Sequence, residues 1–109
     1  MRIVIPAEGA DLDAPTSPVF GRCRTLMFVD ADTFAFEALD NPARDEVGGA
    51  GVQAVELVLQ HGAEAVIARR LGPNAFRMIK SAGLPTYVLE GATVREVVRA
   101  FQARRLRKL

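Results

Sequence analysis

Residues 62–74 read Gly-Ala-Glu-Ala-Val-Ile-Ala-Arg-Arg-Leu-Gly-Pro-Asn, and this stretch decides the fold class. Its apolar run, residues 65–68, is typical of a short strand buried on both faces of a sheet. Gly62 is placed to end a helix before the strand, and Pro73 suits the first position of a helix after it. A helix, a buried strand and a second helix in succession predict an α/β protein with parallel strands.

Three helices follow from the spacing around this unit. The first carries an apolar face at helical intervals, made by Val52, Val55, Val58 and Leu59. The second runs from Pro73 to about Ala82 and ends at Gly83. Thr93 and Glu96 form a capping box that opens the third, whose buried stripe is Val94, Val97, Val98 and Phe101.

Strands are predicted before, between and after these helices. The first is residues 3–5, closed by Pro6, and the second is residues 25–30. A turn at residues 30–32 leads into a third strand, residues 33–39, with Phe34 and Phe36 on one face. A last strand covers residues 86–89. The long loop at residues 7–24 is of a length that is more often functional than idle.

The predicted order is therefore β-β-β-α-β-α-β-α, an antiparallel start followed by right-handed parallel crossovers. We expect a mixed five-stranded sheet in three layers with helices on its faces, a ribonuclease H-like architecture. With 109 residues, 50% of them hydrophobic, residues 1–109 are expected to form one domain. A chain this short would gain buried surface as a homo-oligomer.

Charge and cysteine content exclude several classes of protein. The net charge of +1 gives no basic field for nucleic acid. The basic run at residues 103–109 is interpreted as a solvated or frayed helix end, with nucleic-acid contact as the less favoured alternative. The lone Cys23 excludes an internal disulfide. No leader or membrane-spanning pattern is present, and the prediction is a cytoplasmic protein.

The predicted topology brings glycine-rich turns to one edge of the sheet. The end of the first strand, at residues 6–9, meets residues 22–24 there. The helix starts at residues 48–51, 72–74 and 91–93 are expected on the same side, as one rim of three helix N-termini. Such termini present unpaired N–H groups and a positive dipole end, which favour an anion. Three nearby arginines would reinforce this preference: Arg22, Arg69 and Arg70.

Each feature of this rim also has a reading without a ligand. Gly62, Gly83 and Gly91 are assigned to helix ends and a turn, while residues 48–51 and 72–74 serve either a ligand or only the chain reversal. Neither turn matches a Walker A loop or a dinucleotide fingerprint. Cys23 is either a soft metal ligand, with its pKa lowered by the flanking arginines, or a small buried hydrophobic residue.

Other candidate chemistry is weaker. The only histidine, His61, falls near a helix C-terminus away from the proposed rim, where its charge would be favourable. Glu8, Asp11 and Asp13 do not form the two-metal centre of a nuclease, because that centre needs an acidic residue inside the first strand. They are interpreted as groups that solvate or cap the loop.

Four segments together resemble the dinitrogenase iron-molybdenum cofactor biosynthesis family (NifX and the C-terminal part of NifB) over nearly the whole chain. They are residues 1–6, residues 17–22, residues 48–54, and residues 65–67 with 71–76. The resemblance implies a ribonuclease H-like fold without nuclease activity, in a non-enzymatic protein related to nitrogen fixation. It implies binding and carrying of an anionic metal–sulfur cluster, an iron-molybdenum cofactor precursor or related iron–sulfur or molybdenum species. A cofactor-assembly or acceptor protein is the implied partner.

The site implied for such a cluster combines the rim with the loop before it. Its residues are Phe20, Gly21, Arg22, Gly49, Gly51, Gly72 and Asn74, with Cys23 as the metal ligand. Val19 stands where many relatives carry a histidine before Phe-Gly, so either Cys23 compensates or cluster binding is altered in this chain. Two alternatives stay open: an enzyme or sensor for a phosphorylated metabolite at the same rim, and an interaction module that uses the sheet edge or the basic tail.

Overall fold

A mixed five-stranded sheet forms the centre of the molecule. The structure, a computed structural model, describes residues 1–45 and 48–109. The strands are β1 (Arg2–Ala7), β2 (Thr25–Asp30), β3 (Phe36–Asp40), β4 (Ala65–Ala68) and β5 (Thr86–Val88). They lie in the order β3-β2-β1-β4-β5. β1 pairs antiparallel with β2 and parallel with β4, while β3 is antiparallel to β2 and β5 is parallel to β4.

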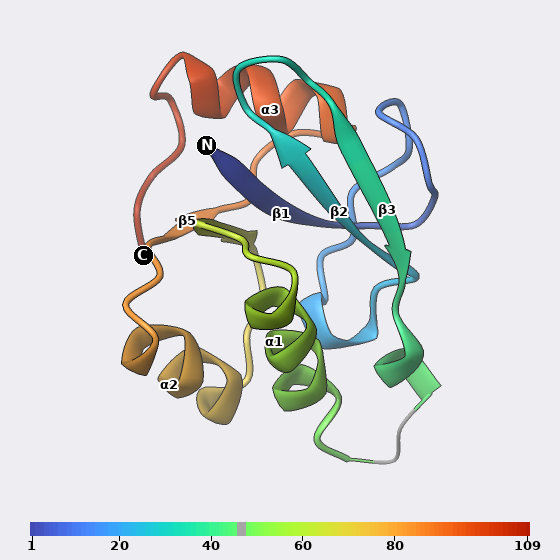
Figure 1. The fold of residues 1–109 in the computed structure, drawn as a ribbon, viewed down its shortest axis with the longest axis vertical. Helices are drawn as coiled ribbons and strands as arrows, with labels where there is room; N and C mark the ends of the chain where they lie inside the picture. The colour runs from blue at the N-terminus through green and yellow to red at the C-terminus, as the bar shows by residue number, and fades with distance from the viewer. Residues whose placement is uncertain (46–47) are drawn as a thin grey trace.

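Helices cover both faces of this sheet. They are α1 (Ala50–Gln60), α2 (Pro73–Ser81) and α3 (Val94–Gln102), with short 3-10 turns η1 (Phe20–Arg22) and η2 (Pro42–Asp45). Figure 1 shows α3 on one side of the strands and α1 with α2 on the other. The predicted α/β class, element order and three layers are therefore confirmed. None of the described helices has the length and apolar character needed to cross a bilayer.

The alternation of side chains along β1 divides the core in two. Ile3 and Ile5 point to the α3 side, where they pack with Val94 and Val97. Val4 points the other way, into the cluster that α1 and α2 cover. All residues of β1 from Ile3 to Ala7 are buried, as expected for a strand at the centre of a sheet with helices on both faces.

The hairpin between β2 and β3 is longer than predicted. Phe34 has a φ of 66° and lies in the turn, so β3 begins only at Phe36. The Asp30 carboxylate accepts hydrogen bonds from the backbone N–H groups of Asp32 and Thr33, which holds the chain in a turn. The Phe34 ring packs on the α3-side core instead of sharing a strand face with Phe36.

Two further details differ from the predicted pattern. Leu59, assigned to the buried face of α1, is 41% exposed, whereas Ala54, which was not assigned to that face, is buried. The basic C-terminal run is not a solvated helix end. After α3 it turns back and pairs with the outer edge of β5, where Val88 N–H donates to the Arg107 carbonyl at 2.7 Å and Leu109 N–H to the Thr86 carbonyl at 2.7 Å.

Candidate functional site

The first turns of α1 and α2 lie together beyond the ends of β1 and β4. They line one shallow concavity of about 170 Å³, formed by residues 49–52 and 72–75. We call this set of residues the amide rim. The prediction that the turns around Gly49 and Gly72 share one place is therefore confirmed (Figure 1).

Within the described part of the chain, neither helix of the amide rim is capped by a side chain. The first hydrogen bond of α1 is Gln53 N–H to the Gly49 carbonyl at 3.0 Å, and that of α2 is Phe76 N–H to the Gly72 carbonyl at 3.0 Å. Among residues 1–45 and 48–109, the N–H groups that precede these bonds have no acceptor; they belong to Ala50, Gly51, Val52, Asn74 and Ala75. Two positive dipole ends with free donors therefore lie at one concavity, although the backbone at Gly21 covers the Gly51 nitrogen from the other side.

Glycine allows the parts of the amide rim to approach closely. A β-carbon on Gly51 would lie 3.1 Å from the Ala75 β-carbon, so α1 and α2 pack nearly backbone to backbone at their starts. Gly49 has a φ of 72°, a left-handed conformation that glycine adopts without strain. On the other side of α1, the backbone of η1 at Gly21 rests on the first turn of the helix.

The loop before η1 is fastened to the end of β4. Arg70 N–H donates to the Pro18 carbonyl at 3.1 Å, and Phe20 N–H donates to the Arg70 carbonyl at 3.3 Å. Val19, the residue before Phe20-Gly21, forms a parallel bridge with Arg70. The Arg69 and Arg70 side chains are exposed, shortly before the α2 N-cap Gly72 in the sequence.

Only some of the predicted site residues line the concavity of the amide rim. Gly49, Gly51, Gly72 and Asn74 line the concavity. Phe20 is fully buried and does not line the concavity. Arg22 is exposed, and its guanidinium donates to the Arg44 carbonyl at 3.0 Å.

The third helix start does not join the amide rim, and this part of the prediction is wrong. Val94 N–H donates to the Ala14 carbonyl at 3.1 Å and Arg95 N–H to the Leu12 carbonyl at 2.7 Å. Glu96 N–H donates to the Thr93 hydroxyl at 3.2 Å, which confirms that half of the predicted capping box. The free donors of α3 are thus used by the loop at residues 12–14 and by the cap.

Cys23 is buried, as the second of its two predicted readings has it, and the lowered pKa of the first reading is wrong. Its side chain has no solvent exposure and packs in the cluster under α1 and α2. Burial raises the pKa of the thiol to about 12, although a hydrogen bond from Asn41 partly offsets this effect. A metal could reach the sulfur only if these contacts opened, and the role of Cys23 as a metal ligand stays a prediction.

Asn41 was not foreseen from the sequence, yet it holds the loop that carries Gly21 and Cys23. Its side chain is fully buried. The amide nitrogen donates to the Cys23 carbonyl at 2.9 Å and the Gly21 carbonyl at 3.2 Å, and the amide oxygen accepts from Ala43 N–H at 3.1 Å. The dipeptide Asn41-Pro42 is a turn signal, but nothing in it indicates these distant partners.

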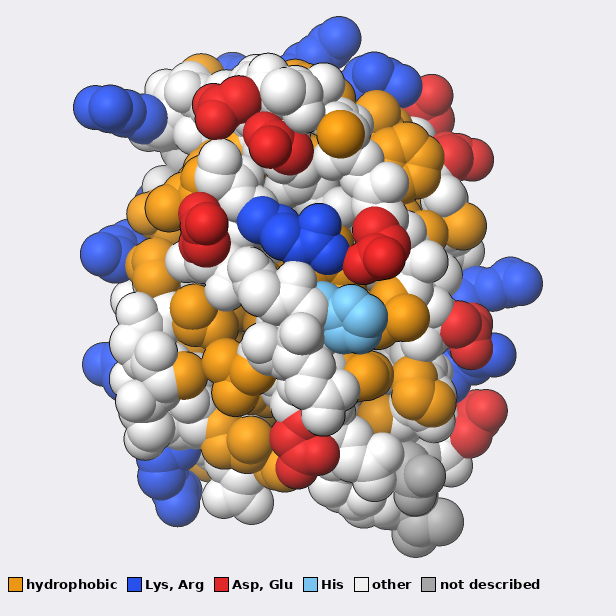
Figure 2. Space-filling model, viewed as in Figure 1, with side chains coloured by type: hydrophobic (Ala, Val, Ile, Leu, Met, Phe, Trp, Pro, Cys, Tyr) orange, Lys and Arg blue, Asp and Glu red, His pale blue; other side chains and the backbone are white. Residues whose placement is uncertain are grey.

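The histidine and the loop acids take the places predicted for them. His61 caps the far end of α1, with Nδ1 3.5 Å from a Glu37 oxygen, and Figure 2 shows its ring among charged side chains. Glu8 accepts from Arg24 N–H, and Asp13 pairs with Arg95 at 2.9 Å. Over residues 1–45 and 48–109, no group of three His, Cys, Asp or Glu residues is placed to hold a metal.

Several known proteins are similar to this chain over nearly its full length. The apo form of the orange protein from Desulfovibrio gigas superposes with a TM-score of 0.93 at 35% identity, over 99% of this chain and 92% of that one. A Thermotoga protein provisionally described as NifB gives a TM-score of 0.85 at 35% identity, with the same coverage. An uncharacterized protein of Methanocaldococcus jannaschii is 29% identical over 99% of this chain and 91% of its own length.

The sequence pattern of one family extends over every helix and strand of the fold. The model of the dinitrogenase iron-molybdenum cofactor family matches residues 1–104, from β1 past the end of α3. The match includes both helix starts of the amide rim and the loop that rests on them. This chain belongs to the dinitrogenase iron-molybdenum cofactor family.

Proposed function

We propose that this chain is a non-catalytic carrier of an anionic metal–sulfur cluster, which it holds at the amide rim and passes to a cofactor-assembly or acceptor protein. The observation that carries the proposal is the pair of uncapped helix starts facing one concavity. Family membership supports the choice of cargo. The exposed Arg69 and Arg70 side chains, on the segment that leads into α2, add positive charge at this end of the molecule.

The donor set favours capture of a whole cluster over ligation of a single metal ion. Backbone N–H groups and guanidinium groups donate hydrogen bonds to sulfide or oxide surfaces but form no bond to a metal. The thiol of Cys23 is buried, with its pKa raised to about 12, and does not supply a thiolate at neutral pH. The cargo would therefore arrive assembled and leave unchanged, as a carrier requires.

Anaerobic reconstitution tests the proposal. The purified protein is mixed with iron, sulfide and molybdate and desalted, and its visible absorption and metal content are measured. We expect a coloured protein with bound metal. Gly72→Ala, at φ −65° and with nothing within 4 Å of the new β-carbon, should fold normally but bind less because it fills part of the concavity. Arg70→Gln should also bind less, whereas Arg99→Gln, on the opposite face, is the matched control.

Two results would contradict the proposal. A wild-type protein that stays colourless and metal-free, yet gains thermal stability from sugar phosphates or nucleotides, would identify the rim as a phosphate site. Rim variants that bind cluster as well as the wild type would place the cargo elsewhere on the molecule.

A further inference from the structure

A second concavity lies at the other end of the sheet from the amide rim. Its volume is about 610 Å³, within the range of roughly 300–1,000 Å³ that is usual for small-molecule sites. It is bounded by the start of β1 at Met1, by Tyr87 on β5, and by the end of α3 with the subsequent Leu106. Since β1 begins here and ends at the rim, the two sites are separate, and a ligand in this concavity is independent of the cluster proposed for the rim.

Arg104 occupies a backbone position in this concavity that favours glycine. It follows the C-cap of α3 with a φ of 57°, and the next residue, Arg105, donates its N–H to the Ala100 carbonyl at 2.9 Å. The equivalent positions after α1 and α2 are Gly62 and Gly83, with φ of 73° and 74°. An arginine at such a position is strained, and strain of this kind gathers at functional sites.

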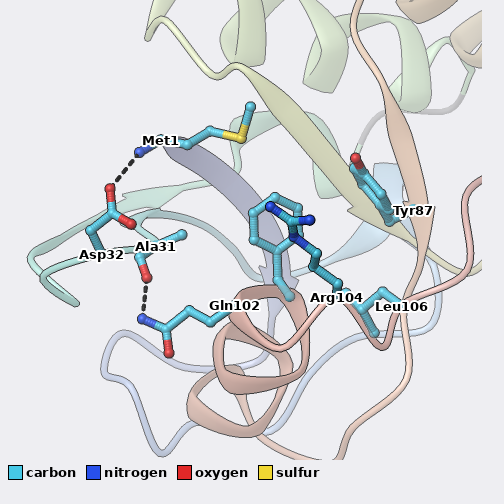
Figure 3. Close-up of a pocket in the computed structure, with 8 residues that line it drawn as sticks. Met1, Ala31, Asp32, Tyr87, Gln102, Arg104 and Leu106 are labelled. Atoms are coloured by element: carbon cyan, nitrogen blue, oxygen red, sulfur yellow. Dashed lines mark hydrogen bonds and ion pairs between the residues drawn. The ribbon is translucent and has the colours of Figure 1, made fainter.

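Two donor side chains of the concavity, on Arg104 and Tyr87, have no partner among the described residues. Asp32 pairs with the Met1 ammonium at 3.3 Å, and Gln102 donates to the Ala31 carbonyl. Across the described residues, the Arg104 guanidinium and the Tyr87 hydroxyl have no hydrogen-bond or ion-pair partner. Figure 3 shows the guanidinium directed into the space between Met1 and Tyr87. A ligand that satisfies these groups carries negative charge.

The walls of the concavity suit an aromatic ring. Tyr87 and Phe101 meet edge to face, with ring centroids 5.2 Å apart and planes at 90°. Both rings are half-buried, and Met1 and Leu106 add apolar surface beside them. A further ring can pack against such a pair in the same offset or edge-to-face arrangement.

We infer that this concavity binds a small aromatic carboxylate. The planar guanidinium of Arg104 accommodates the carboxylate through two parallel hydrogen bonds, and the Tyr87 hydroxyl donates a third. The aromatic ring of the ligand lies against Tyr87 and Phe101. A glycine at residue 104 would relieve the backbone strain but would remove the charge that holds the ligand.

Chemical-shift mapping of the full chain with 3-phenylpropionate tests the inference. We expect saturable shifts at the amides of Arg104, Tyr87 and Phe101. Binding should weaken at least tenfold with 3-cyclohexylpropionate, which lacks the aromatic ring, and with 3-phenylpropanol, which lacks the charge. Arg104→Gly should lose at least tenfold in affinity while its Tm stays equal or rises, because the backbone strain is removed. Arg105→Gln, next in sequence but outside the concavity, should bind as the wild type does.

Several results would overturn the inference. They are an absence of shifts around Arg104 with 3-phenylpropionate, equal binding of the uncharged alcohol, and wild-type affinity in Arg104→Gly. A lower Tm in Arg104→Gly would show that the arginine serves the fold instead, and would overturn it as well. Tighter binding of phenyl phosphate than of the carboxylate would reassign the ligand class.

Discussion

Gly21 of η1 rests directly on Gly51 of α1. A β-carbon on Gly21 would lie 2.7 Å from the Gly51 nitrogen and 2.8 Å from its α-carbon, closer than any real contact allows. Because Gly51 in turn faces Ala75 at the start of α2, one line of small residues joins the predicted binding loop to both helices of the amide rim. The geometry of the rim therefore depends on the absence of side chains.

Gly21→Ala should destabilise the fold by about 1–3 kcal/mol, because the added methyl meets rigid backbone instead of a flexible side chain. The measurement is urea unfolding followed by circular dichroism. Gly48→Ala is the matched control: it lies next to the same rim, has open space around the new β-carbon, and should change stability by no more than about 0.5 kcal/mol. Equal losses in the two variants would contradict the close contact.

Asn41→Leu should lower the free energy of unfolding strongly, although the two side chains are similar in size. The substitution leaves the Gly21 and Cys23 carbonyls and the Ala43 N–H, in a buried region, without the partner that the Asn41 amide provides. Each unsatisfied buried group costs roughly 1–3 kcal/mol, so we expect a loss of several kcal/mol in unfolding free energy. Asn41→Asp should also be strongly destabilising, because it places a buried carboxylate against the two carbonyl oxygens that the Asn41 amide nitrogen contacts. A neutral result in Asn41→Leu would mean that η1 is held by its other contacts.

The buried Cys23 thiol should make the folded protein less stable as the pH rises into the alkaline range. Its pKa is about 12 in the folded protein, against ~8.5 in an unfolded chain. Below about pH 8.5 the thiol is protonated in both the folded and the unfolded state. Above that pH the unfolded chain loses the proton while the folded protein keeps it. The free energy of unfolding therefore falls as the pH rises toward 12. At about pH 10 the loss should reach roughly 2 kcal/mol relative to pH 7. Urea unfolding at both pH values should show this loss in the wild type but not in Cys23→Ala, and parallel curves would contradict it.

The helices and strands could largely be predicted from local sequence patterns. Hydrophobic periodicity, helix caps and helix-terminating glycines all depend on residues that are neighbours in the sequence. Pro73 starts α2 and Gly83 follows its C-cap, as expected from short-range rules. Parallel strand pairing then placed the starts of α1 and α2 together. Two missed features depend on segments far apart in sequence: carbonyls at residues 12–14 occupy the donors of α3, and Asn41 with the surrounding core buries Cys23. No spacing within the sequence indicates such contacts.

Loss of the ion pair between Asp13 and Arg95 should lower the stability of the fold at acid pH. A hydrogen bond from Arg95, together with its charge, lowers the pKa of Asp13 below the ordinary value. Its stabilising contribution is therefore present above the unfolded pKa of ~3.9 and is lost as pH falls through the lower folded value. Asp13→Asn should be less stable than the wild type at pH 7, and the gap should close toward pH 2. Asp45→Asn, another exposed acid, should show little gap, and a gap that is constant with pH would contradict the assignment.

Deletion of residues 106–109 should both weaken the fold and expose a sheet edge. The tail buries Leu106, worth about 1.5–3 kcal/mol, and pairs with Thr86 and Val88 on β5. Without it, β5 presents unpaired backbone groups that can join a second molecule, so the truncated chain should self-associate with increasing concentration. Leu106→Ala separates the two effects: its stability should fall while the edge stays covered and the oligomeric state stays that of the wild type. Urea unfolding and sedimentation velocity measure these outcomes. A truncated chain whose oligomeric state matches the wild type at every concentration would show that the tail only packs against β5 and does not protect it.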